Sequence, residues 1–238
     1  MSRHCSDEYA GLGISRSFFS LVTEYIQGDA FMSYSIKVIK KHEQITAAWS
    51  GGTTTQLAIY PENAEYNKRN FLWRISTASI QDEQSLFTCL PDFWRKLMVI
   101  EGEVILEYEG SRQVGLTPYE QESFSGGWVT RSMGKVTDFN LITAAGCRGE
   151  LEALFIKKGT SREIDCHKDD VEFSLVTEAF YCTEGQVRFS INEDQSLWLE
   201  KGDICVLSRR ASLDKVNIKI SHSGNESAAY VIRAHIVS

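Results

Sequence analysis

The sequence predicts an all-β protein built from two β-modules of one type in a single chain. The first observation is the run from Trp94 to Tyr108, which is apolar on both faces from Leu97 to Ile100 and alternates after Glu101-Gly102. An unbroken apolar run is typical of a strand covered on both sides, and alternation with a period of two is typical of a strand with one wet side. Because Gly102 offers the backbone freedom of a tight turn, we expect a hairpin here.

The second observation is that this pattern returns between Ala179 and Ile191. A strand-like run again leads into Glu184-Gly185 and then into alternating apolar residues. Each copy is followed by a turn-rich stretch, at 116–119 and at 199–203. Such self-similarity indicates two modules of the same kind in tandem.

Composition bounds the class of protein. The chain has 238 residues, and its content of 42% hydrophobic residues can fill the cores of two small β-domains. The net charge of -7 and the lack of a Lys/Arg block argue against a nucleic-acid partner. No apolar run is long enough for a membrane span, and the N-terminus lacks a signal-peptide core, so we expect a cytoplasmic protein without a membrane partner.

The six cysteines are widely spaced and form no CxxC pair. In a reducing compartment such cysteines are more often free thiols than disulfides. We therefore expect no disulfide framework.

We divide the chain into an extension at 1–33, a first barrel at 34–150 and a second barrel at 151–238, with strands that can be exchanged between the two. In the extension, Phe18, Leu21, Val22 and Tyr25 have helical spacing, which predicts a short helix that ends near Gly28. The helix either packs on the β-body or covers an oligomer contact, such as that of a homodimer.

Further strands are expected along both modules. A glycine turn at 51–52 enters a threonine-rich strand, but no lysine follows it, which excludes a phosphate-binding P-loop. The expected strands cover residues 35–41, 53–60, 71–80, 136–142, 204–207, 216–220 and 228–237.

Two arginines raise the question of which strand face is inside. Trp73 and Ile75 share one face of their strand, and Arg74 lies on the other. If the aromatic face packs between sheets, Arg74 points outward, which is the commoner place for an arginine. If the other face lines a barrel, Arg74 lies in a cavity and needs an anionic partner. Arg95, on the face of Leu97, presents the same alternatives.

Polar residues also interrupt an apolar strand face at Asp138 and Asn140, between Val136 and Ile142. Buried polar side chains are normally hydrogen-bonded, so these two either tie a barrel end together or contact a ligand.

The halves are expected to join between about 146 and 170, with a polar, turn-like stretch at 157–163. His167, Asp169, Asp170 and Glu172 look like metal ligands, but a charged cluster of this kind is more often a solvated loop.

Five blocks of the first half occur in an order that resembles the HutD/Ves family, whose paired modules resemble a bicupin. The blocks are Trp49–Leu57, Phe71–Ala78, Arg95–Gly102, Phe124–Gly127 and Asp138–Leu141. The resemblance implies two tandem cupin-type barrels of the jelly-roll kind (a double-stranded β-helix). It also implies an association with histidine utilisation.

Metal-dependent cupins need an HxH pair, a glutamate and a later histidine, and none of the five histidines here forms such a pair. We therefore expect no metal and no cofactor. The family resemblance implies instead that a polar set lines a pocket in the first barrel, in which the arginines can hold a carboxylate bidentately. This set is Gln56, Arg74, Ser76, Arg95, Asp138 and Asn140.

Three functions remain open at this point. The first is a metal-free binding or regulatory bicupin for a small acidic metabolite. The second is a metal-independent enzyme of the isomerase or hydrolase type, in which Asp138 or a glutamate is the general base. The third is a protein-interaction or assembly module that uses the N-terminal extension.

Overall fold

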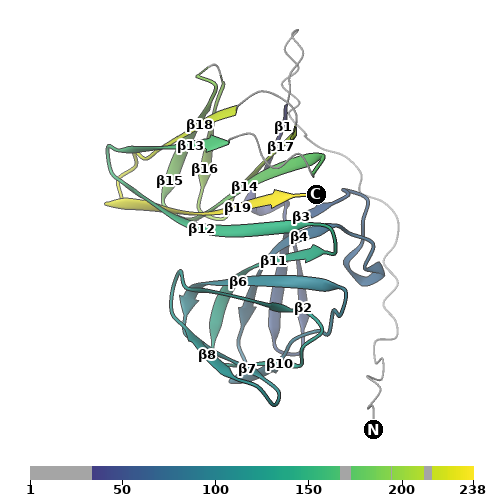
Figure 1. Cartoon of the computed structure of the whole chain (residues 1–238). Coiled ribbons are helices and arrows are strands. Elements are labelled where there is room, and N and C mark those ends of the chain that lie inside the picture. The colour runs from purple at the N-terminus through teal and green to yellow at the C-terminus, as the bar shows by residue number, and fades with distance from the viewer. Residues whose placement is uncertain (1–33, 167–172, 194, 212–215) are drawn as a thin grey trace.

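The protein is described by a computed structural model that covers residues 34–166, 173–193, 195–211 and 216–238. Two barrels lie one above the other, and each is made of two sheets (Figure 1). The predicted all-β class with two barrels is therefore confirmed. The predicted N-terminal helix and the cluster at 167–172 lie outside the described residues. Among those residues, no helix is long and apolar enough to cross a membrane.

The first barrel combines a six-stranded sheet, β2-β3-β4-β11-β6-β9, with a four-stranded sheet, β5-β10-β7-β8. Its strands are β2 (Ile45–Trp49), β3 (Gly52–Tyr60), β4 (Trp73–Ile80), β5 (Gln84–Leu86), β6 (Phe93–Gly102), β7 (Val104–Tyr108), β8 (Gln113–Leu116), β9 (Gln121–Ser125), β10 (Thr130–Met133) and β11 (Val136–Ala144). Two short 3-10 helices, η1 (Lys41–Glu43) and η2 (Tyr66–Lys68), interrupt the loops.

The second barrel combines a five-stranded sheet, β1-β17-β14-β19-β12, with a four-stranded sheet, β13-β18-β15-β16. Its strands are β1 (Tyr34–Ile39), β12 (Arg148–Lys157), β13 (Ser161–Cys166), β14 (Leu175–Glu184), β15 (Gln186–Ile191), β16 (Gln195–Glu200), β17 (Ile204–Arg210), β18 (Val216–Ser221) and β19 (Ala228–Val237).

The second barrel draws strands from both ends of the chain. β1 precedes the first barrel in sequence but pairs antiparallel with β17 of the second. Its end is held by Asp203, which accepts hydrogen bonds from Lys40 Nζ at 2.8 Å and from the Lys41 backbone N–H at 3.0 Å. The stretch expected to join the halves is also largely strand, because β12 and β13 lie within it.

The prediction that each Glu-Gly turn closes a hairpin is wrong. β6 pairs with β9 and β11, whereas β7 pairs with β8 and β10 of the opposite sheet. At Gly102 the chain crosses between the sheets with φ of +83°, and a Cβ there would lie 2.4 Å from the Lys135 carbonyl oxygen. Glycine is needed because this corner combines a left-handed backbone with a close approach. β14 and β15 part in the same way at Gly185.

The predicted repeat extends to the register of the strands. β6 pairs with β11 across a bulge that skips Ile100, and β14 pairs with β19 across a bulge that skips Thr183. These two residues occupy the same position relative to their Glu-Gly pairs. By the same count, Arg95 in the first barrel is equivalent to Glu178 in the second.

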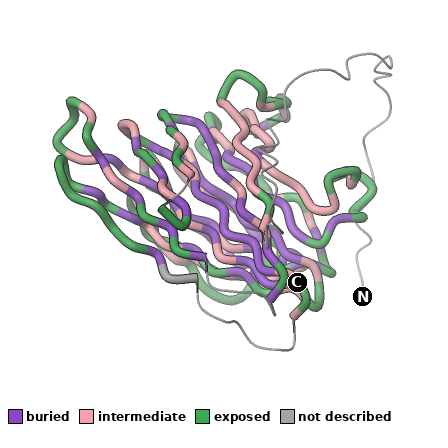
Figure 2. Tube along the Cα trace, turned by 90° about the horizontal axis from the view of Figure 1, so that it is seen from above, coloured by how far each residue is buried: buried purple, intermediate pink, exposed green. Residues whose placement is uncertain are grey.

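Buried residues lie along the middle of the strands, and exposed residues gather at the loops (Figure 2). The buried apolar residues form three main cores. One fills the second barrel, from Leu154 to Val231. One lies between the barrels and includes Trp73, Ile75 and Ile232, so the outer face of the six-stranded sheet is buried against the neighbouring barrel. The third, which includes Leu97 and Phe124, fills part of the first barrel.

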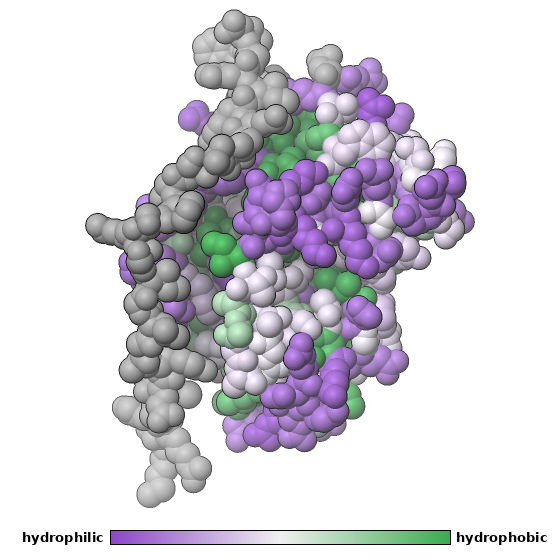
Figure 3. Space-filling view, turned by 180° about the vertical axis from the view of Figure 1, so that it is seen from behind, coloured by the Kyte–Doolittle hydropathy of each residue, from purple (hydrophilic) through white to green (hydrophobic). Residues whose placement is uncertain are grey.

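The surface seen from behind shows hydrophilic residues at the lower end of the first barrel and across the upper half of the molecule, with hydrophobic residues in separate smaller areas between them (Figure 3). The cysteines Cys89, Cys147, Cys182 and Cys205 are free thiols, as expected.

Candidate functional site

The inner face of the six-stranded sheet brings the six predicted site residues together. In one row across the strands, Arg74 pairs with Ile142, which pairs with Arg95. In the next row, Gln56 pairs with Ser76, which pairs with Asn140. Asp138 follows on the same face of β11.

This polar layer lies between apolar clusters. Along β11, Val136 belongs to the core of the first barrel and Ile142 to a smaller cluster with Phe71 and Phe93. Asp138 and Asn140 lie between them and are buried. The arrangement in which Arg74 points outward is therefore wrong. Trp73 and Ile75 do pack between sheets, but the opposite face is buried as well.

Arg74 is held by contacts on three sides. Its Nε donates to Gln56 Oε1 at 3.0 Å and its Nη1 donates to Ser76 Oγ at 3.0 Å. Its guanidinium lies over the Tyr66 ring, 4.4 Å from the ring centroid. Burial lowers the pKa of Arg74, and the charge of Arg95 lowers it further. These contacts fix the orientation of the guanidinium but supply no negative charge.

Arg95 lies between aromatic rings. Its Cζ is 4.7 Å from the centroid of Phe87 and 5.6 Å from that of Phe124. Nη1 donates to the Thr88 carbonyl oxygen over a long 3.5 Å, and the buried Nε has no partner. Burial lowers the pKa of Arg95, although arginine remains charged in proteins.

Asp138 is 1% exposed, and its Oδ1 has no hydrogen-bond partner. Burial raises its pKa from the ordinary 3.8 to about 7, against the opposing charge of Arg95. Among the described residues, no ion pair joins the two side chains. The nearby Asn140 Oδ1 is likewise buried without a partner. Native proteins pair nearly all such atoms, so both acceptors call for a donor.

The charges of the layer do not balance. Two buried guanidinium groups face one carboxyl, and that carboxyl is half neutral near pH 7. A buried charge without compensation is costly, which makes an added anion favourable here. The residues that cover the arginines, Gln56, Tyr66 and Phe87, are only half-buried, so the guanidinium groups lie one layer below the surface.

Four residues of this layer were missed by sequence reasoning. Tyr66, Phe87 and Phe124 contact the guanidinium groups, and Tyr108 contributes a buried hydroxyl without a partner. Tyr108 lies on an expected apolar position, where alternation indicates burial but not contact with a charge, and Phe124 stands in a block noted only for its family resemblance. Tyr66 and Phe87 lie outside regular strands, so no periodicity points to them.

Comparison with known proteins identifies the family. The sequence profile of the HutD family matches residues 41–227. The chain belongs to the HutD family. No protein with a curated description matches the chain.

Solved structures support the HutD assignment at the level of the fold. A conserved protein of unknown function from Pseudomonas aeruginosa is 19% identical, with a TM-score of 0.71 over 86% of this chain and 100% of its own. HutD from Pseudomonas fluorescens is also 19% identical, with a TM-score of 0.60 over 84% and 98%. An oxalate decarboxylase from Lactobacillus farciminis is 8% identical, with a TM-score of 0.61 over 88% and 87%. The fold of this HutD chain is thus that of the cupins.

In this HutD chain, the part described by the structure contains no group of three or more His, Cys, Asp or Glu residues placed to hold a metal. His222 has both ring nitrogens near carbonyl oxygens, with Nδ1 2.8 Å from Gln186 and Nε2 3.0 Å from Glu226. Its role is to tie a loop to the end of β15.

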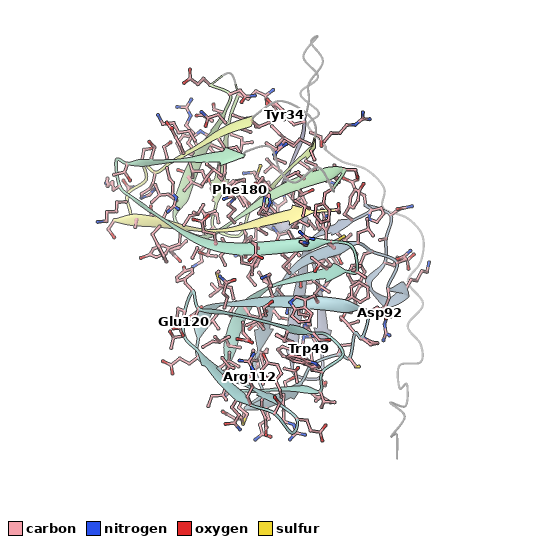
Figure 4. The ribbon with its side chains drawn as sticks, in the orientation of Figure 1. Tyr34, Trp49, Asp92, Arg112, Glu120 and Phe180 are labelled. Atoms are coloured by element: carbon pink, nitrogen blue, oxygen red, sulfur yellow. The ribbon has the colours of Figure 1, made fainter. Side chains whose placement is uncertain are left out.

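The second barrel of this HutD chain places a different cluster at the position of Arg95. Glu178, 1% exposed, accepts hydrogen bonds at 2.8 Å from both Nε and Nη2 of Arg233, and His235 Nδ1 lies 2.8 Å from its Oε1. Burial acts to raise the pKa of Glu178, but the hydrogen bonds from His235 and Arg233 outweigh it and lower the pKa. Apolar side chains fill the interior of the second barrel. One of them is Phe180, which is labelled in Figure 4. This cluster has its charges paired inside the protein.

Proposed function

We propose that the first barrel is a metal-free binding site for a small carboxylic acid, held by Arg74 and Arg95. The observation that carries the proposal is the excess of buried positive charge, two guanidinium groups against one carboxyl whose pKa is about 7. A guanidinium fork matches a carboxylate, and the pair forms strong charge-assisted hydrogen bonds. Membership of the HutD family supports a role linked to histidine utilisation, either as a metabolite-binding protein or as a regulator.

The geometry of Arg74 suits this role. Because Gln56, Ser76 and Tyr66 orient its guanidinium in advance, little side-chain entropy remains to be lost when an anion binds. Arg95 keeps an unused Nε donor, which an acid can satisfy. The unpaired donor and the oriented cation together support an anion site at this position.

Isothermal titration calorimetry and thermal shift against N-formyl-L-glutamate, N-formimino-L-glutamate, L-histidine and urocanate test the proposal. We expect at least one acid to bind. Arg74→Ala and Arg95→Met should each weaken the affinity for that acid roughly ten- to a hundredfold, the range for hydrogen bonds to charged groups. Arg131→Ala, at an exposed arginine of β10 in the same barrel, should leave the affinity unchanged. The proposal would be contradicted if none of the four compounds bound, or if both site variants bound an acid as tightly as the wild-type protein does.

A second function is favoured by one observation, the raised pKa of Asp138, which is a value suited to a general base at neutral pH. In that case the barrel is a metal-independent isomerase or hydrolase. The four compounds incubated with the protein and followed by NMR should then change, and Asp138→Asn should abolish turnover while the thermal unfolding curve keeps its shape. Binding without any chemical change restricts the protein to the first function.

A further inference from the structure

The inner layer of the first barrel leaves both kinds of hydrogen-bonding atom unused. Two buried acceptors, Asp138 Oδ1 and Asn140 Oδ1, have no partner, and neither do two buried donors, Arg95 Nε and Tyr108 Oη. An arginine such as Arg95 commonly binds a carboxylate. A carboxylate, however, only accepts hydrogen bonds and so leaves the oxygens of Asp138 and Asn140 unpaired.

The two acceptors lie side by side. Asp138 and Asn140 are two positions apart on β11, so their side chains leave the same face of the strand. Asn140 pairs in register with Ser76 of β4, whose hydroxyl accepts from Arg74. The acceptor pair is therefore adjacent to the anion site and belongs to the same layer.

We propose that the acid bound by the first barrel carries an N–H donor beside its carboxylate, and that Asp138 with Asn140 selects for that donor. The inference rests on the proposed function, because the arginines must first hold the acid. Asp138 and Asn140 are then specificity-determining residues. An acid without a donor leaves two buried acceptors unpaired inside the complex, which costs affinity.

Asp138 is the group of the layer whose pKa, about 7, lies near neutral pH. The other charged and titratable groups of the layer are Arg74 from β4, Arg95 from β6, Tyr108 from β7, with Glu122 of β9 beside it, and Tyr66 of η2. Of these, Arg95 is the group whose charge acts on Asp138. An ionised Asp138 accepts from an N–H, whereas a protonated Asp138 can donate to an acceptor. Selectivity for the donor should thus rise as the carboxyl ionises.

A matched pair of probes tests this inference. N-acetyl-L-glutamate carries an amide N–H, and 2-acetoxyglutarate has an ester oxygen at the same position. We expect calorimetry at pH 8 to show the amide bound roughly ten- to a hundredfold more tightly, the cost of unpaired buried acceptors. The ratio of the two affinities should fall from pH 8 to pH 6, because Asp138 takes up a proton over this range. Repulsion between the Asp138 carboxylate and the carboxylates of the probes is common to both probes and cancels in the ratio.

Variants complete the test. Asp138→Asn should remove the pH dependence of the ratio, and Asn140→Ala should reduce the ratio independently. Thr137→Val, on the opposite face of β11, should leave it unchanged. Equal affinity for both probes at every pH, with Arg95→Met still weakening both, overturns the inference but not the proposed function. Failure of both probes to bind overturns the inference, and the proposed function falls with it when the four-compound panel also fails to bind. Binding of the probes that is untouched by Arg95→Met overturns the two together.

Discussion

The two barrels treat one structural position in opposite ways. Arg95 and Glu178 occupy the same place relative to the Glu-Gly corner, and each has a neighbour on both flanking strands. Glu178 has its two oxygens paired with Arg233 and His235. Arg95 is flanked by Ile142 and Phe124, and its Nε is unpaired.

The difference separates a structural charge cluster from a candidate binding site. A buried ion pair whose hydrogen bonds are complete holds strands together and has little left to offer a ligand. A buried charge whose partners are absent costs stability, and a protein that retains it is expected to use it elsewhere. This contrast supports the proposal that the ligand site lies in the first barrel and that the cluster of the second barrel has a structural role.

The largest effect is expected when the paired cluster is broken. Glu178→Leu leaves Arg233 and His235 without their shared carboxylate, so we expect the free energy of unfolding to fall by about 3–5 kcal/mol. Urea denaturation followed by circular dichroism measures the change. Arg95→Met, at the equivalent position, should alter stability by less than about 1 kcal/mol, because a buried charge gives way to an apolar chain.

The contrast would fail in either of two ways. A small loss in the free energy of unfolding for Glu178→Leu would mean that the cluster contributes little to stability. A large loss for Arg95→Met would mean that Arg95 stabilises the fold, in spite of its unpaired Nε.

The second effect is a pH dependence in the first barrel. The pKa of Asp138 in the folded protein, about 7, lies above that of an aspartate in the unfolded chain, so folding favours its proton. The stability from this group is fully present below about pH 4 and is lost as the pH rises to about 7. Asp138→Asn does not titrate, so the stability of the variant minus that of the wild type should grow by roughly 2–4 kcal/mol over this range.

Thermal or urea unfolding of both proteins at several pH values measures this difference. Glu120→Gln is a suitable control in the same barrel, since that carboxylate is exposed and hydrogen-bonded to Thr117, which lowers its pKa. A flat difference between pH 4 and pH 7 for Asp138→Asn would show that the carboxyl is ionised throughout and already has a partner.

Much of this fold could be predicted from local patterns. The alternation after each Glu-Gly pair gave the correct inner faces of β7 and β15, and the repeat proved accurate to the position of a bulge. The hairpins could not be predicted correctly, because a tight glycine turn looks the same in sequence whether the strands pair or cross between sheets. Only the pairing of β6 with β9 and β11, and of β7 with β8 and β10, decides this.

The six candidate residues were expected to lie together, but their arrangement was not predicted. Alternation placed Arg74 opposite Trp73, yet it could not say which face was inside, because the second barrel buries the outer face too. The buried role of Glu178 could not be predicted from its own strand, because its partners Arg233 and His235 come from β19. Pairings between distant strands carry this information.

The smallest effect compares the two corner glycines. Alanine at either must adopt a left-handed backbone, since φ is +83° at Gly102 and +76° at Gly185, which costs about 1–2 kcal/mol in each barrel. A Cβ at Gly102 would also lie 2.4 Å from the Lys135 carbonyl oxygen, whereas at Gly185 the nearest atom is Ala229 Cβ at 3.1 Å. We therefore expect Gly102→Ala to destabilise by roughly 1–2 kcal/mol more than Gly185→Ala in urea denaturation. Equal losses would mean that the first barrel's corner can shift as readily as the second's, and that its polar layer is less rigidly framed than its hydrogen bonds indicate.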